Sequence, residues 1–205
     1  MLLEQNLTFS RYAVSGTDAS VLSEIYNPDT QICIWNPQFS QDVLEYALTL
    51  RQGAGNLSLR QVIAPLELSE YLASALPNSE ARPVFINEIQ TIAEMFAYLF
   101  ELERIGFRMG VLENAMCPKF HTDKVPCRLV ATLKGKGTEW LNQSQTLSWR
   151  QDKTYEPAWE SLEPGQIALL KGEGWFENEG QGLVHRSPSA GPDDWRLFLS
   201  IDFAN

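Results

Sequence analysis

The chain has 205 residues, of which 44% are hydrophobic and 11% aromatic, and a formal net charge of −10. These values exclude an intrinsically disordered chain and fit one domain with a buried core. The acidic balance, without a block of Lys and Arg, argues against nucleic acid as a partner. There is no signal-peptide pattern, no membrane-spanning apolar run and an odd, sparse set of cysteines, so we expect a cytoplasmic protein without a membrane partner.

The first half of the chain carries mainly helical patterns. The predicted elements are a short helix over residues 19–26 capped by Asp18, a buried strand at 31–35, a helix at 41–51, a strand at 57–63, and helices at 66–76 and 82–105. The last helix has apolar residues at helical spacing, and Gly106 is placed to be its C-cap. A helix of this kind packs across the outside of a sheet.

From residue 107 the pattern changes to short strands and turns. The predicted strands cover residues 107–112, 125–133, 139–141, 146–149, 166–170, 182–184 and 195–203. We therefore expect a single α+β domain over residues 1–205, with a mainly helical support region at 1–106 and a β core at 107–205.

The only two histidines lie at the ends of strand-like segments. His121 is followed by Asp123, and residues two apart on an extended segment point to the same side. His185 ends a second apolar run much later in the chain. Two imidazoles and one carboxylate form the facial triad of non-haem Fe(II) oxygenases, which leaves open metal positions. We interpret His121, Asp123 and His185 as metal ligands.

The sequence resembles the 2-oxoglutarate/Fe(II)-dependent dioxygenase superfamily. The resemblance is carried by His121-x-Asp123, the distal His185 and Arg196 in the final strand-like run WRLFLSIDF. Within it, CPKFHTDKVPCRLVATLKGKGTEWL and VHRSP are similar to the bacterial domain-of-unknown-function 1826 family. The resemblance implies a double-stranded β-helix, a jelly-roll-like or cupin-like barrel, packed by the helices of the first half. It also implies that Arg196 binds the far carboxylate of 2-oxoglutarate, although Phe198 stands where a serine is common.

The function expected from this resemblance is an Fe(II)- and 2-oxoglutarate-dependent oxygenase of unspecified substrate. Arg128, early in the strand after the motif, is either a second anion anchor inside the barrel or a solvated charge. The alternative is a non-catalytic protein that holds Zn(II) on the same barrel through the same residues, with Cys117 as a possible fourth ligand. A third possibility is a degenerate barrel used only for protein contacts.

Overall fold

The computed structural model describes residues 12–54 and 57–204. The helices are η1 (Ala19–Tyr26), α1 (Gln41–Ala54), η2 (Pro65–Glu67), α2 (Leu68–Ala75), α3 (Arg82–Leu99) and α4 (Gln143–Gln151), η denoting 3₁₀ helices. The strands are β1 (Ala13–Gly16), β2 (Ile32–Trp35), β3 (Ser58–Ile63), β4 (Ile105–Leu112), β5 (Cys127–Lys134), β6 (Glu139–Trp140), β7 (Glu160–Ser161), β8 (Ile167–Lys171), β9 (His185–Arg186) and β10 (Arg196–Phe203). The α+β class is confirmed. None of the helices in these two ranges is long and apolar enough to cross a membrane.

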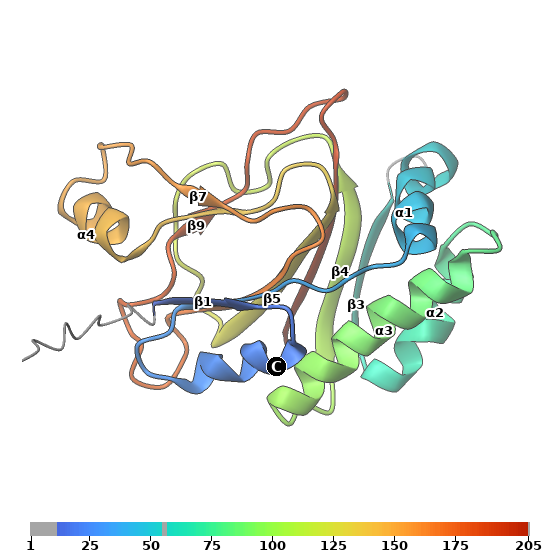
Figure 1. Ribbon diagram of the computed structural model, residues 1–205, viewed down its shortest axis with the longest axis horizontal. Coiled ribbons are helices and arrows are strands. Elements are labelled where there is room, and N and C mark those ends of the chain that lie inside the picture. The colour runs from blue at the N-terminus through green and yellow to red at the C-terminus, as the bar shows by residue number, and fades with distance from the viewer. Residues whose placement is uncertain (1–11, 55–56, 205) are drawn as a thin grey trace, which may run out of the picture.

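The strands form two sheets. A seven-stranded sheet has the order β1-β2-β8-β5-β10-β4-β3, and a three-stranded sheet has the order β7-β6-β9. In the large sheet only the β1–β2 pair is parallel. Helices α1 to α3 lie on one side of the large sheet, and the small sheet with α4 lies on the other (Figure 1). No pairing joins the two sheets within the described ranges, so the sheets are not closed into a barrel.

The alternation of side chains along β10 assigns a role to each face of the large sheet. Leu197, Leu199 and Ile201 belong to the main core, which also contains the buried side of α3. Arg196 and Phe198 point the opposite way, and Phe198 belongs to a second core shared with the small sheet. The inner face of the large sheet is therefore the one that faces the small sheet and can hold a site.

The predicted helix over residues 82–105 is too long, and Gly106 is not its cap. The helix ends at Leu99, and Glu101 adopts a left-handed conformation with φ of 53°. The amide of Glu101 donates to the carbonyl of Tyr98, and that of Leu102 donates to the carbonyl of Ala97. This is a Schellman motif with glutamate in the position that glycine usually takes. Gly106 lies inside β4 instead.

The predicted strand at 146–149 is wrong, because this segment is part of helix α4. Asn142 accepts a hydrogen bond from the amide of Gln145, and the Gln145 side chain accepts one from the amide of Asn142. This capping box satisfies two backbone donors at the start of the helix. The first half of the chain is also more than helical support, since it supplies the edge strands β1 and β3 and the strand β2.

Candidate metal centre

The two histidines are brought together by a short antiparallel bridge. The amide of His121 donates to the carbonyl of His185 at 3.0 Å, and the amide of His185 donates to the carbonyl of His121 at 2.9 Å. The centroids of the two rings are 4.6 Å apart. Segments 64 positions apart in sequence therefore present their imidazoles side by side.

Backbone carbonyls hold the Nδ1 atoms of both rings. The Nδ1 of His121 lies 2.9 Å from the carbonyl of Lys119, and the Nδ1 of His185 lies 3.2 Å from the carbonyl of Leu183. A carbonyl only accepts, so in the neutral ring each Nδ1 carries the proton and donates it. This arrangement leaves the Nε2 lone pair of each ring free, which is how metal-binding histidines are commonly oriented.

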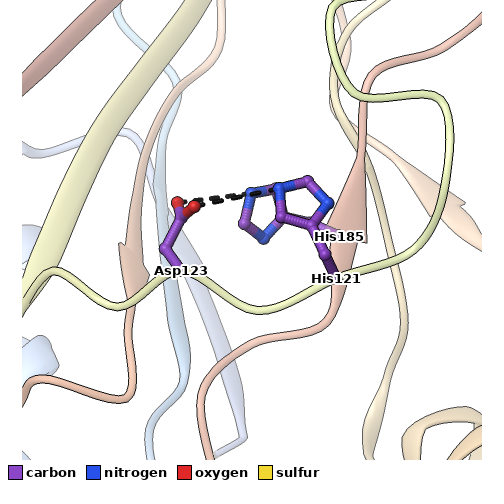
Figure 2. Close-up of side chains that lie close together, drawn as sticks. All are labelled: His121, Asp123 and His185. Atoms are coloured by element: carbon purple, nitrogen blue, oxygen red, sulfur yellow. Dashed lines mark ion pairs between the residues drawn. The ribbon is translucent and has the colours of Figure 1, made fainter.

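Asp123 faces the two Nε2 atoms. Its carboxylate oxygens lie 3.8 Å from the Nε2 of His121 and 3.4 Å from the Nε2 of His185 (Figure 2). One ligand atom from each of the three residues can be chosen so that all lie within 4.8 Å of one another. These separations are longer than an N–H···O hydrogen bond and are of the size expected around an ion with ligand bonds of about 2 Å. The donor set of two imidazoles and one carboxylate suits Fe(II).

Burial keeps His185 in the form that binds metal. Removal of His185 from water lowers its pKa to about 4, so the imidazole is neutral at neutral pH. Asp123 accepts a hydrogen bond from the Nη1 of Arg128 at 2.8 Å. The same guanidinium donates twice to Asp202, at 2.6 and 3.1 Å. Arg128 thus orients the carboxylate of Asp123, and its own charge is balanced by two acids.

A cavity of about 480 Å³ opens beside the three residues. Its wall includes His121 and His185 and much of the inner face of the large sheet. The side chains that line it from that sheet include Arg60, Val62, Arg108, Arg128, Val130, Phe198, Ser200 and Asp202. Cys117 also lines the cavity, but it is not one of the three residues whose ligand atoms converge. All three cysteines of the chain are free.

Arg196 is buried on the same inner face. Its Nε donates to the carbonyl of Lys136 at 2.6 Å, and its Nη2 donates to the Thr132 hydroxyl at 3.0 Å. Burial lowers the pKa of Arg196 to about 10, which leaves it charged at neutral pH. No carboxylate pairs with it among residues 12–54 and 57–204.

The core that contains Phe198 includes an unused hydrogen-bond donor. The indole Nε1 of Trp140 is buried and has no hydrogen-bond partner in the described part of the chain. Trp140 packs in the same core as Phe198, and the Arg196 guanidinium lies 5.1 Å from the centroid of the Phe198 ring. Phe198 lines the cavity, whereas Arg196 does not.

Sequence reasoning missed Arg60 and Arg108, which share the cavity wall with the histidines. Each is a charged residue within a strand pattern, in SLRQVI and IGFRMGVL. That signal was available, but the pairing of β3 with β4 that brings them together was not.

Solved structures of other proteins share this fold. A prolyl-4-hydroxylase from Pseudomonas putida is 13% identical, with a TM-score of 0.50 over 91% of this chain and 97% of that one. A full-length protein from Neurospora crassa, solved in complex with alpha-KG and 5-formyluracil, is 10% identical, with a TM-score of 0.52 over 93% of this chain and 83% of that one. Identities this low show similarity of fold alone.

The family of the chain follows from its sequence. The model of the family described as "Protein of unknown function (DUF1826)" matches residues 16–202, so the chain belongs to that family. No curated protein matches the sequence. The family description carries no activity, and the function has to be argued from the site.

Proposed function

We propose that this protein is a cytoplasmic non-haem oxygenase that uses Fe(II) and 2-oxoglutarate. The observation that carries the proposal is the convergence of His121, Asp123 and His185, with both Nδ1 atoms held by carbonyls and both Nε2 atoms directed at one carboxylate. Without an ion, the free lone pairs of the partly exposed His121 and the buried His185 would face an anion across a gap too wide for hydrogen bonds. A divalent cation between the three side chains would accept both Nε2 lone pairs and balance the charge of the carboxylate.

The arrangement of the strands supports a double-stranded β-helix. In chain order, β4, β5, β8 and β10 belong to the large sheet, whereas β6, β7 and β9 belong to the small one. The chain thus crosses repeatedly between two facing sheets, and the bridge at His121 adds a further crossing between β4 and β5. The two histidines then come from the small-sheet side, Asp123 comes from the segment between His121 and β5, and Arg128 and Arg196 come from the large-sheet side.

Arg196 supports 2-oxoglutarate as the co-substrate. A buried cation without a counterion is costly. A carboxylate placed near Phe198 would supply the counterion that Arg196 lacks. Arg196 can offer a planar fork to such a carboxylate, and Thr132 already holds one end of that fork. The hydroxyl of Thr132 stands in for the serine that is common two residues after this arginine.

In this proposal the residues have distinct roles. His121, Asp123 and His185 would hold Fe(II), which together with 2-oxoglutarate would activate O₂ for the oxidation of a C–H bond. Arg128 keeps Asp123 oriented, and Arg196 binds the far carboxylate of the co-substrate. The apolar second core around Phe198 excludes water from the reacting centre.

The alternative of a Zn(II)-binding protein lacks its fourth ligand. A structural zinc site is usually closed by four protein ligands. Only three residues converge within the described ranges, and Cys117 is not among them. An open coordination face favours the enzyme over the binder.

The experiment is metal analysis after anaerobic purification, combined with a 2-oxoglutarate consumption assay. We expect about one Fe(II) per chain and slow succinate formation without substrate, both abolished by the double variant His121→Ala/His185→Ala. The matched control is Cys117→Ala, which should retain both properties. Tight zinc that iron does not replace, with no 2-oxoglutarate consumption, would overturn the proposal in favour of the binder.

A further inference from the structure

Two arginines lie directly opposite each other on the wall of the cavity. Arg60 of β3 pairs in register with Arg108 of β4, and both side chains line the cavity that contains His121 and His185. Directly opposed residues on antiparallel strands have Cβ atoms about 5 Å apart. The two guanidiniums can therefore meet on one small group.

The charge balance within the cavity separates this pair from the other arginines there. Arg128 is paired with Asp123 and Asp202, and Arg186 with Glu139 and Glu156. Arg60 and Arg108 have neither an ion pair nor a side-chain hydrogen bond to any residue in the ranges 12–54 and 57–204. Two positive charges without an ion-pair partner in these ranges thus lie on the wall of a cavity, in a chain whose net charge is −10.

The simpler interpretation of a charged residue in a sheet is a solvated side chain that keeps an edge strand from pairing with another chain. It accounts for Arg60, which is exposed on the edge strand β3. It does not account for Arg108, which is only partly exposed on β4, a strand paired on both sides. Like charges directly opposite each other also destabilise a sheet, and a role in solubility does not require the two arginines to be opposed.

We propose that Arg60 and Arg108 bind an oxyanion, a phosphate or a carboxylate, on the substrate of this enzyme. The inference rests on the proposed function and names the substrate class for the same site. β10 separates β4 from β5, so Arg108 lies two strand spacings, about 10 Å, across the sheet from Arg128 beside Asp123. The net charge of −10 disfavours a polyanion, and a cavity of about 480 Å³ has the size of a small-molecule site, so the substrate is a small molecule with its anionic group on this pair.

Substrate length follows from the same geometry. Ser200 and Asp202 of β10 form the cavity floor between the arginine pair and Arg128. The reacting carbon has to lie near the metal ligands while the oxyanion lies on β3 and β4. A substrate with several bonds between these two groups fits, whereas one with the anion adjacent to the reacting carbon does not.

The test is anion binding to the metal-free protein, measured by thermal shift and calorimetry at constant ionic strength. Inorganic phosphate and acetate are titrated separately, to distinguish a phosphate group from a carboxylate. We expect one of them to raise the Tm of the wild-type protein, and Arg60→Gln and Arg108→Gln each to weaken its binding at least about tenfold. Arg104→Gln is the matched control, because Arg104 is a nearby exposed cation absent from the cavity wall. The affinity of this variant for the anion should stay within about twofold of the wild-type value.

The unliganded variants provide a second readout. If the pair is a binding site, Arg60→Gln and Arg108→Gln should keep or raise the Tm without ligand, since each removes a like-charge contact. A fall in Tm without ligand would indicate structural arginines and overturn the inference. So would the absence of phosphate and acetate binding to wild type, or binding that neither variant weakens.

Failure of this inference differs from failure of the proposed function. A wild-type protein that binds Fe(II) and 2-oxoglutarate but shows no arginine-dependent anion binding overturns the oxyanion site alone. A wild-type protein that binds phosphate through Arg60 and Arg108 but binds no metal overturns the oxygenase and supports the anion site.

Discussion

Asp123 is the only acid of the candidate triad, and it is held from two directions. Its carboxylate faces the Nε2 atoms of His121 and His185 and accepts a hydrogen bond from Arg128. We expect Asp123→Ala to weaken Fe(II) binding by more than the roughly 10- to 100-fold that loss of an outer partner costs, with the fold retained. Anaerobic metal titration and circular dichroism measure the two properties.

Asp202→Ala is the control for this variant. Asp202 also binds Arg128 but is not one of the three converging residues. Its removal should cost at most the outer-partner penalty of about 10- to 100-fold. Equal losses of affinity in the two variants would show that Asp123 acts through Arg128 and not as a ligand.

His185 makes the stability of the metal-free protein depend on pH. An imidazole in the unfolded chain has a pKa of about 6.5, and burial lowers the pKa of His185 to about 4 in the folded protein. Between these values the unfolded state binds the proton more tightly, so stability is present above about pH 6.5 and is lost as the pH falls toward about 4. From about pH 7.5 to about pH 5 the loss from this group is about 2 kcal/mol.

Urea unfolding in the presence of a chelator measures this loss. The variant His185→Gln should lose about 2 kcal/mol less than wild type over the same pH interval. Identical pH slopes for the two proteins would mean that His185 is not desolvated in the folded state.

The triad could be predicted from sequence because the chain contains only two histidines and an aspartate lies two residues after one of them. The oxyanion pair could not. Arg60 and Arg108 are 48 positions apart, and only the register of β3 on β4 places them opposite each other. A register is fixed by the burial of one face, which the sequence of either strand alone does not determine.

At the scale of elements, α3 packs its buried side into the main core on the outer face of the large sheet. Phe96 is 1% exposed and packs edge-to-face on Phe100 and Phe203. Phe96→Ala should reduce the free energy of unfolding by about 3 to 5 kcal/mol, because it leaves a cavity in the core. Tyr98→Ala on the same helix is the control, since Tyr98 is 89% exposed and its loss should stay within about 0.5 kcal/mol. Denaturant unfolding measures both variants. A loss of free energy of unfolding for Phe96→Ala as small as that for Tyr98→Ala would mean that the Phe96 side of α3 is exposed to water.

The end of α3 shows where local sequence signals mislead. Glycine is the usual residue at the left-handed position of a Schellman motif, so the sequence pattern favours Gly106 over Glu101 as the helix end. A left-handed residue other than glycine costs about 1 to 2 kcal/mol. We expect Glu101→Gly to stabilise the protein by about 1 kcal/mol, because it relieves the left-handed strain. Glycine also raises the entropy of the unfolded chain, and this effect reduces the net stabilisation. A loss of stability in chemical unfolding would contradict the assignment of the helix end.

The strand predicted within α4 fails for a different reason. The stretch at residues 146–149 alternates polar and apolar residues as a strand does, whereas the decisive signal lies before it, in Asn142 and Gln145. A capping box fixes the first turn of a helix regardless of the weak pattern that follows. Periodicity alone therefore misassigns this helix between β6 and β7.

For the whole molecule, the α+β fold class and most of the strands could be predicted from the sequence. The way in which strands from the first and second halves of the chain form one sheet could not. Strands β1 and β2 extend the large sheet beyond β8, and β3 extends it beyond β4. These long-range pairings have no local signature. They matter for function, because β3 carries Arg60 and widens the inner face on which the cavity lies.

The central claim joins the three ligand residues to Arg196 in one site. It is tested most directly by calorimetric titration of 2-oxoglutarate into the anaerobic Fe(II)-loaded protein and into the metal-free protein. We predict binding that requires the metal, weakened about 30-fold or more by Arg196→Ala and less by Arg196→Lys, which keeps the charge but loses the planar fork. An Fe(II)-loaded protein with no affinity for 2-oxoglutarate, or one whose affinity is unchanged in Arg196→Ala, would contradict the account.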